Sequence, residues 1–286
     1  MAQNEQRAIE ALLQRHGFHF SKAKGQNFLI DREIPRRIAL TSEADASNGV
    51  LEVGPGIGAL SSELCRRAGR VVAVELDTSL LPILDETMAD FDNFSIVSAD
   101  VLKLDLAALV RERFEGLTPI VCANLPYNIT TPVLTAFLEA GCFESLTVLI
   151  QREVAERLCA KPGTAAYGAF SVFMQYYTTP RICFEVPPEY FIPRPKVTSA
   201  VLRAEVRKAP PVAVEDEAFF FRVVNAAFAL RRKTLVNSLM TAFGALGKEQ
   251  LAALVVSCGL DANVRGERLG LAEFARLAAA LREAGA

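Results

Sequence analysis

The sequence has few of the residues that build metal clusters and disulfide frameworks. Its 286 residues include only two histidines, His16 and His19, and its six cysteines are scattered singly without a CxxC pair. A structural zinc site needs closely spaced cysteine and histidine ligands, and this sequence offers no such set. We therefore predict no metal site and reduced thiols in a cytoplasmic protein.

Long apolar runs that could span a membrane are also missing. The longest stretch without a charged residue, 116–138, contains Pro119, Pro126 and Pro132, which would leave unpaired backbone groups inside a bilayer. The first ten residues include three charged side chains and lack an apolar segment, so no secretory signal is expected. A short amphipathic pattern near the N-terminus leaves a mitochondrial presequence open, although its acidic residues disfavour it.

A general excess of positive charge is absent as well. The net charge is −2 and the isoelectric point is about 5.9, which by itself argues against binding of nucleic acid. Basic residues nevertheless gather in two zones, since residues 1–40 have a local charge of +3 and residues 191–233 one of +5. The two zones could form one nucleic-acid-binding face, and ordinary solvated surface charge is the alternative.

Short apolar runs alternate with helical periods between residues 49 and 151. Each run is continuously apolar rather than alternating, as expected of parallel strands that are covered on both faces. The alternation predicts an α/β fold with a mostly parallel sheet built from βαβ units. The predicted strands are Gly49–Val53, Arg70–Glu75, Phe94–Ser98, Thr118–Ala123 and Ser145–Ile150.

The chain after residue 151 shows a different pattern. Helices are predicted near 152–159 and 168–176, followed by two strand-like runs, 181–186 and 198–206, that suit an antiparallel hairpin on the sheet edge. A proline-containing linker at 208–211 then leads to a segment with helical periods and glycine breaks. We predict two domains, residues 1–209 with the sheet and residues 210–286 as a small all-α domain.

A glycine-rich turn follows the first predicted strand. The ExGxGxG run at 52–58 places Gly54 and Gly56 where the backbone must approach a ligand closely, and it suits NAD, FAD or S-adenosylmethionine. Glu75 ends the second strand and could accept hydrogen bonds from two ribose hydroxyls. Asp100 ends the third strand and could bind an adenine amine, although a helix N-cap is an equal alternative.

The fourth strand ends in Asn124-Leu125-Pro126-Tyr127. The amide oxygen of Asn124 and the backbone carbonyl of Leu125 can each accept a hydrogen bond from the exocyclic amine of a flipped-out adenine. Pro126 stiffens the turn and Tyr127 offers a ring for stacking, although Asn-X-Pro is also an ordinary turn. Because strand ends meet at one edge of a parallel sheet, this motif, Gly54, Glu75 and Asp100 are predicted to share one site.

Three further motifs in this chain, taken together with the glycine loop and the strand-end residues, match the motif pattern of one enzyme family. The set, which spans about residues 20–275, resembles the ribosomal RNA small-subunit adenine N6-dimethyltransferases, most closely the bacterial members. Its further motifs are Gly25-Gln26-Asn27-Phe28-Leu29, Phe191-Ile192-Pro193-Arg194-Pro195-Lys196-Val197 and Arg231-Arg232-Lys233-Thr234-Leu235. One departure is mild, since relatives often have histidine where this chain has Asn27.

The resemblance implies a Rossmann-like class I methyltransferase that uses S-adenosylmethionine to dimethylate two adjacent adenosines in the 3′-terminal hairpin of 16S rRNA, with a role in small-subunit biogenesis. It also implies that Phe191 stacks on the target base opposite Tyr127. The residues implied to bind the cofactor are Asn27, Leu29, Gly54, Gly56, Glu75, Asp100 and Asn124.

The predicted RNA contacts are basic residues of the second zone, and a solvated basic stripe is the alternative. Arg231, Arg232 and Lys233 are too close in sequence to share one helix face, so some must point elsewhere. The expected partner is 16S rRNA within the small ribosomal subunit or its precursor, with no membrane, no metal and a monomeric protein. The predicted contacts are Arg194, Lys196, Arg222, Arg231, Arg232 and Lys233.

Three rival functions remain. A macrolide-resistance methyltransferase would dimethylate an adenine of large-subunit rRNA with nearly the same N-terminal motifs, but the Arg231–Leu235 motif and the long second domain resemble the small-subunit family. A non-catalytic assembly or transcription factor of the same fold is disfavoured by the intact Asn124–Tyr127 motif. A dehydrogenase would need a proton-transfer group near the nicotinamide, and both histidines precede the first strand.

Overall fold

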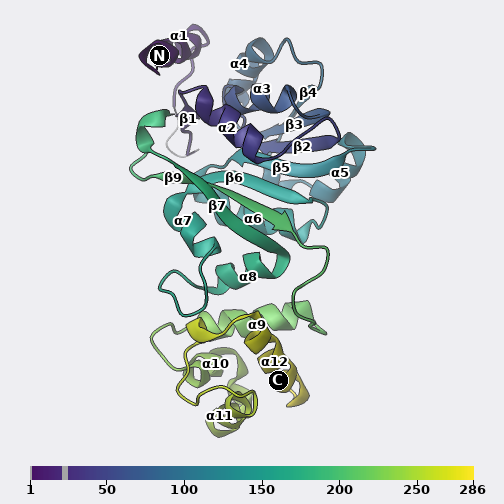
Figure 1. Ribbon diagram of the computed structural model, residues 1–286, viewed down its shortest axis with the longest axis vertical. Helices are drawn as coiled ribbons and strands as arrows, with labels where there is room; N and C mark the ends of the chain where they lie inside the picture. Colours follow the sequence, from purple (N-terminus) through teal and green to yellow (C-terminus); the bar gives the residue numbers. More distant parts are fainter. Residues whose placement is uncertain (1, 21–24) are drawn as a thin grey trace. The chain divides into compact units, whose positions relative to one another are not determined.

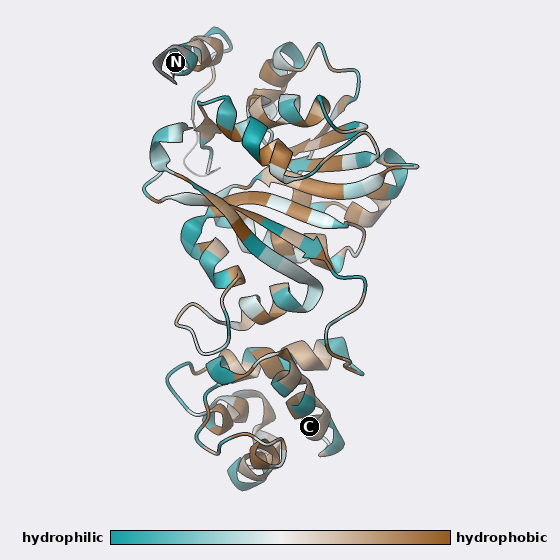
Figure 2. Ribbon diagram, viewed as in Figure 1, coloured by the Kyte–Doolittle hydropathy of each residue, from teal (hydrophilic) through white to brown (hydrophobic). Residues whose placement is uncertain are grey.

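The apolar runs form a seven-stranded mixed sheet, as predicted. The computed structural model describes residues 2–20 and 25–286. Figure 1 shows the strands side by side, and Figure 2 shows that apolar residues dominate the central ones. In sheet order the strands are β4 (Phe94–Ser98), β3 (Arg70–Glu75), β2 (Asn48–Val53), β5 (Thr118–Asn124), β6 (Ser145–Gln151), β9 (Ser199–Val206) and β7 (Thr178–Val186).

The order of the strands determines where a ligand can bind. Strands β2 to β6 run parallel to one another, whereas β9 lies antiparallel to β6 and also neighbours β7 at the edge. The chain runs from β2 outward to β4 and then returns to the other side of β2 with β5 and β6. The carboxyl ends of β2 and β5 therefore flank the switch point, where open α/β sheets bind their ligands.

Helices connect the parallel strands and cover the sheet (Figure 1). Aspartates cap two of the helical segments: Asp100 accepts a hydrogen bond from the Leu102 N–H at 3.1 Å at the start of a short 3-10 helix, and Asp105 accepts one from the Ala108 N–H at 2.9 Å at the start of α5 (Leu106–Arg113). The helices of this part are α2 (Glu33–Thr41), α3 (Ala59–Cys65), α4 (Leu81–Thr87), α5 (Leu106–Arg113), α6 (Thr130–Glu139) and α7 (Arg152–Leu158).

The N-terminal helix α1 (Ala2–Arg15) is attached to the sheet unit by a buried leucine and by charge. Leu13 is buried in the same apolar core as the strands. Arg15 forms an ion pair with Glu86 of α4, and His16 Nε2 lies 2.6 Å from the other carboxylate oxygen of Glu86.

A second, two-stranded sheet was not predicted. Strand β1 (Phe28–Leu29) pairs antiparallel with β8 (Phe191–Ile192), so that Leu29 lies opposite Phe191. The Ile30 N–H extends this ladder by donating to the Tyr190 carbonyl at 3.0 Å. Two motifs that are far apart in the sequence are thereby joined by backbone hydrogen bonds.

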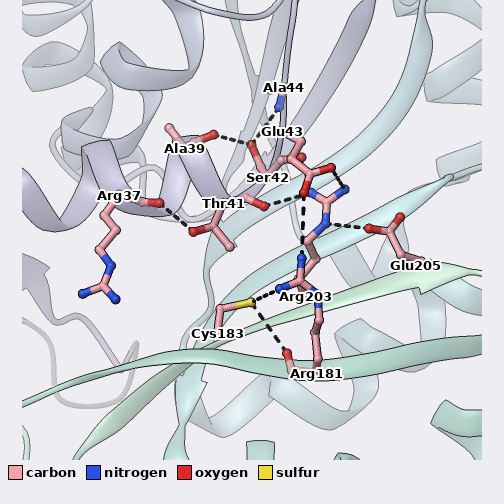
Figure 3. A network of polar contacts seen from close by, with 10 residues as sticks. All are labelled: Arg37, Ala39, Thr41, Ser42, Glu43, Ala44, Arg181, Cys183, Arg203 and Glu205. Carbon is pink, nitrogen blue, oxygen red and sulfur yellow. Dashed lines mark hydrogen bonds and ion pairs between the residues drawn. The ribbon is translucent and has the colours of Figure 1, made fainter.

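Arg203 is buried at 5% exposure on β9, which corrects its assignment to a surface basic zone. Its guanidinium donates to the Thr41 carbonyl at 2.9 Å and to the Ser42 carbonyl, both at the C-terminal end of α2 (Figure 3). It also pairs with Glu43 at 3.1 Å and with Glu205 at 2.6 Å. Arg203 therefore satisfies carbonyl groups that a helix end leaves unpaired, and it is not available to bind RNA.

The C-terminal helices form a separate compact unit with its own core. This unit comprises residues 156–180 and 207–286, so it includes a segment that the predicted boundary near residue 209 assigns to the first domain. Aromatic contacts explain the grouping, because Tyr176 packs against Phe220 and Phe221 with ring centroids 5.3 Å apart in each pair. The helices are α8 (Ala169–Tyr177), α9 (Glu217–Phe228), α10 (Leu235–Phe243), α11 (Lys248–Ser257) and α12 (Leu271–Glu283).

Helix length and hydropathy give little support for a membrane span. Within residues 2–20 and 25–286, no single helix is long and apolar enough to cross a bilayer. One bent pair of helical segments, Leu235–Leu246 with Lys248–Ser257, is long and apolar enough for a span by length and composition alone.

Candidate active site

A cavity lies at the carboxyl ends of β2, β3 and β5, at the switch point of the sheet. It brings together all seven residues that were predicted to bind a cofactor. Five residues were predicted to be catalytic, namely Asn124, Leu125, Pro126, Tyr127 and Phe191, and all of them except Phe191 line the cavity. The predicted residues that line it are Asn27, Leu29, Gly54, Gly56, Glu75, Asp100, Asn124, Leu125, Pro126 and Tyr127.

The glycine loop forms one wall of this cavity. Gly54, Gly56 and Gly58 have φ angles of 68°, 61° and 84°, in the left-handed region that other residues rarely adopt. A Cβ atom on Gly56 would also lie only 3.0 Å from the ring of Phe28. The loop therefore needs glycine both for its backbone conformation and for its close approach to the opposite wall.

Glu75 presents a buried acceptor to the cavity. Its Oε1 accepts a hydrogen bond from the Asp77 N–H at 2.7 Å, whereas its Oε2 is buried and has no hydrogen-bond partner in the described part of the chain. Burial raises the pKa of Glu75, and the nearby Asp77 carboxylate acts in the same direction. A buried acceptor without a partner is costly, so this oxygen suits a ligand hydroxyl.

Asp100 performs the capping role that the sequence left open as an alternative. One carboxylate oxygen caps the short 3-10 helix at Val101–Lys103, and the other lies 3.9 Å from the Lys103 ammonium. The side chain also lines the cavity and is 31% exposed. Capping therefore does not remove Asp100 from the site, and its contact with an adenine amine stays a prediction.

The orientation of Asn124 is fixed by a contact distant in sequence. Its Nδ2 donates a hydrogen bond of 3.1 Å to the backbone carbonyl of Asn27, which belongs to the opposite wall of the cavity. Since the nitrogen of the amide is engaged, its Oδ1 is the atom left to accept a hydrogen bond from a ligand. Leu125 is tied to β6 through its N–H, which donates to the Leu149 carbonyl at 3.1 Å.

Tyr127 is held at the cavity by a hydrogen bond to β9. Its hydroxyl lies 2.6 Å from the Ser199 hydroxyl, and burial raises the pKa of the phenol. Burial therefore keeps the phenol neutral at physiological pH, and the hydrogen bond to Ser199 fixes the position of its ring at the cavity wall.

Phe191 lies apart from the other predicted catalytic residues. It is 3% exposed, belongs to the apolar core of the sheet unit and does not line the cavity. Stacking on a base would require its ring to leave this packing. Its role stays a prediction.

The predicted RNA contacts differ in how far they are already engaged within the protein. Arg194 lies 3.6 Å from the Glu189 carboxylate in the first unit, and Lys196 is exposed. In the second unit, Arg222 donates to the Ala242 carbonyl at 2.9 Å and lies 4.6 Å from the Phe243 ring centroid.

The segment between α9 and α10 contains the other three predicted contacts. Arg231 donates to the Ala165 carbonyl and lies 3.9 Å from the Glu267 carboxylate. Arg232 and Lys233 are exposed. The second basic zone therefore offers fewer unengaged cations than its composition predicts.

Glu52 lines the cavity and was not predicted as a site residue. It is 1% exposed on β2, and its Oε2 has no hydrogen-bond partner among the described residues. The available signal was an acidic residue inside the otherwise apolar run Val50-Leu51-Glu52-Val53. Such a charge is rarely buried unless it is paired.

The switch-point cavity, glycine loop and strand-end acids define a class I methyltransferase fold. Among solved structures, the 23S rRNA methyltransferase ErmE is 26% identical, with a TM-score of 0.66 over 89% of this chain and 99% of that one. A dimethyladenosine transferase from Plasmodium falciparum, 18% identical, agrees in fold with a TM-score of 0.74 over 90% of this chain and 98% of that one. The chain belongs to the ribosomal RNA adenine dimethylase family, whose pattern matches residues 17–282.

Curated relatives agree over nearly the full length. A protein of a Geobacillus strain is 48% identical over 94% of both chains, and one of Streptococcus pneumoniae strain D39 is 49% identical over 96% of this chain and 97% of that one. Each is named ribosomal RNA small subunit methyltransferase A. The chain is thus an rRNA adenine dimethyltransferase that uses S-adenosylmethionine, and the tight glycine loop and the free Glu75 oxygen suit that cofactor.

Replacing Glu75 by glutamine tests the assignment of the ribose contact. The amide oxygen can still accept from the Asp77 N–H, but the amide nitrogen cannot accept from a hydroxyl. We expect S-adenosylmethionine to bind about 10–100-fold more weakly, the equivalent of losing one hydrogen bond to a charged group. Calorimetric titration measures the change, and Asp85→Asn, an exposed change on α4, is the control. Unchanged affinity in Glu75→Gln would contradict the assignment.

Proposed function

We propose that this chain dimethylates N6 of two adjacent adenosines in the 3′-terminal hairpin of 16S rRNA, within the small ribosomal subunit or its precursor, and thereby takes part in small-subunit biogenesis. Two relatives about half identical to it are named for the small subunit. The observation that supports the chemistry is the orientation of Asn124, whose nitrogen is bound to the Asn27 carbonyl.

The residues at the end of β5 can perform this transfer without a general base. S-adenosylmethionine supplies a methyl group on a positively charged sulfur, which is already a good leaving group. The Asn124 Oδ1 and the Leu125 carbonyl accept hydrogen bonds from the adenine N6–H groups, which favours a pyramidal nitrogen and aims its lone pair. The same two oxygens stabilise the positive charge that develops on N6 during the transfer. Tyr127 supports the base by stacking.

The assignment of roles along the chain follows from this chemistry. Residues 1–209 hold the cofactor and the target base, with Asn27, Leu29, Gly54, Gly56, Glu75 and Asp100 as cofactor contacts. Residues 210–286 dock on the ribosomal particle through their basic residues. The protein acts as a cytoplasmic monomer and needs neither a metal ion nor a membrane.

Docking on a folded particle explains how an acidic protein recognises RNA. With a net charge of −2 and with Arg203 buried, the chain can neutralise few phosphates, so its affinity for free RNA is low. RNA helices are read through their backbone and shape, whereas the target base must come from an unpaired loop. A small subunit presents both features in a fixed arrangement.

A comparison of substrates tests the proposed function. We expect faster methylation of assembled small subunits than of naked 16S rRNA or large-subunit rRNA at equal concentration, measured as labelled methyl transfer, with Asn124→Ala as the background. An equal or faster reaction on naked 16S rRNA would contradict docking on the particle. A preference for large-subunit rRNA would instead favour the activity named for ErmE.

A further inference from the structure

Ser199 is a buried serine at the start of β9 that was not predicted as a site residue. Its hydroxyl lies 2.6 Å from the Tyr127 hydroxyl, and its side chain is 0% exposed. In the ladder between β6 and β9 it lies opposite Gln151. The carbonyl of the preceding Thr198 accepts a hydrogen bond from the Arg152 N–H at 3.0 Å. Backbone pairing on both sides therefore holds the Ser199 hydroxyl in a fixed place.

The ring of Tyr127 depends on this contact for its position. Tyr127 follows Pro126 at the start of a short 3-10 turn, and its partly buried side chain lines the cavity. Within residues 2–20 and 25–286, the contact with Ser199 is the one side-chain hydrogen bond that Tyr127 forms. Because the ring turns about two side-chain bonds, loss of the Ser199 hydroxyl would widen the range of positions that the ring adopts.

The two methyl transfers to one adenine make unequal demands on this ring. In the first transfer, N6 has two N–H groups, which match the two acceptors, Asn124 Oδ1 and the Leu125 carbonyl. After it, N6 carries a methyl group and a single N–H, so one acceptor has no donor. One hydrogen bond then holds the edge of the base, and stacking must supply more of the alignment that the second transfer needs.

We propose that Ser199 is a positioning residue for the second methyl transfer, which holds the Tyr127 ring against the monomethylated adenine when a single hydrogen bond to N6 remains. The inference rests on the proposed function, in which Tyr127 stacks on the target base. Ser199 does not line the cofactor cavity, so it acts through Tyr127 alone. It thereby raises the yield of dimethylated over monomethylated adenosine.

A time course of both products measures this contribution. Enzyme saturated with S-adenosylmethionine is mixed in excess with unmethylated small subunits, and N6-methyladenosine and N6,N6-dimethyladenosine are quantified by mass spectrometry of the digested RNA. In Ser199→Ala we expect the ratio of the second rate constant to the first to fall about three- to tenfold, within the range for one neutral hydrogen bond. Monomethyladenosine should accumulate, and the affinity for S-adenosylmethionine should not change.

Tyr127→Phe is the matched variant at the other end of the same hydrogen bond. It keeps the ring and removes only the hydroxyl, so the ratio should fall to a similar extent. The double variant should lie within about twofold of Ser199→Ala, because the two changes remove one shared contact. Ser145→Ala is the control, since it makes the same replacement at a buried serine of β6, opposite Glu205 at the end away from the cavity. It should keep the wild-type ratio.

The ratio separates positioning from a general loss of folded enzyme, which slows both transfers by the same factor. A wild-type ratio in Ser199→Ala or in Tyr127→Phe would overturn the inference and leave the proposed function unaffected. Wild-type protein that leaves small subunits unmethylated would overturn the proposed function and the inference together. Tyr127→Phe decides the outcome if Ser199→Ala does not fold, because it alters a side chain at the cavity wall rather than one inside the sheet.

Discussion

Replacement of Asn124 by alanine is expected to slow methyl transfer by about 10²–10³-fold in a single turnover, the usual effect of removing one preorganised group that stabilises transition-state charge. The amide oxygen of Asn124 acts on the charge that develops at N6, so its loss affects the transition state more than the bound cofactor. The fold should persist, since the change removes one hydrogen bond, from Nδ2 to the Asn27 carbonyl, worth about 1 kcal/mol.

Rapid mixing of the enzyme, saturated with S-adenosylmethionine, with assembled small subunits measures the rate of this single turnover without interference from product release. Asn263→Ala, which shortens an exposed asparagine in the second unit, is the matched control and should react like the wild type. A rate in Asn124→Ala above about a tenth of the wild-type value would remove the residue from the mechanism, because it would correspond to less than about 1.4 kcal/mol of transition-state stabilisation.

Replacement of Arg203 by methionine should lower the free energy of unfolding of the sheet unit by about 3 kcal/mol, since it leaves buried carbonyl groups at the end of α2 without a donor. Arg203 donates to the carbonyls of Thr41 and Ser42 and pairs with Glu43 and Glu205 (Figure 3). The two glutamates are more than half exposed, so water can solvate their charges after the change. The loss at the carbonyls therefore dominates.

Urea unfolding followed by far-ultraviolet circular dichroism measures the effect. The free energy of unfolding of Arg203→Lys should lie between those of the wild type and Arg203→Met, because one ammonium keeps the charge but cannot reach four partners at once. Arg36→Met is the control on α2, since it removes only an exposed ion pair with Glu33, worth less than about 1 kcal/mol. Equal stability of Arg203→Met and Arg36→Met would show that the α2 contacts are not structural.

The parallel strands could be predicted to within about one residue because burial on both faces produces continuous apolar runs. The same burial on both faces made the position of Arg203 impossible to predict from the sequence. Every residue from Ser199 to Ala204 on β9 is buried, so the strand has no polar alternation that would assign its arginine to a side of the sheet. A charge count along the chain placed Arg203 in a basic surface zone, whereas its partners on α2 are about 160 residues away.

The positions of the site residues could be predicted better than their orientations. Strand ends in a parallel sheet meet at one edge whatever the side chains do, which is why Glu75, Asp100 and Asn124 line one cavity. The hydrogen bond that orients Asn124 comes from Asn27, 97 residues away, and no local pattern encodes it. Strand β1 has only two residues, too few for any periodicity, and so the burial of its partner Phe191 was also missed.

The pairing of β1 with β8 has a thermodynamic consequence. Leu29 lines the cofactor cavity, and its backbone is hydrogen-bonded in register with Phe191, which belongs to the segment predicted to meet RNA. A ligand that holds either strand in place reduces the conformational freedom of the other, and such a coupling between two sites must be equal in both directions. With Phe191 in contact with RNA, the methyl donor and the ribosomal substrate would strengthen each other's binding by the same factor, whichever arrives first.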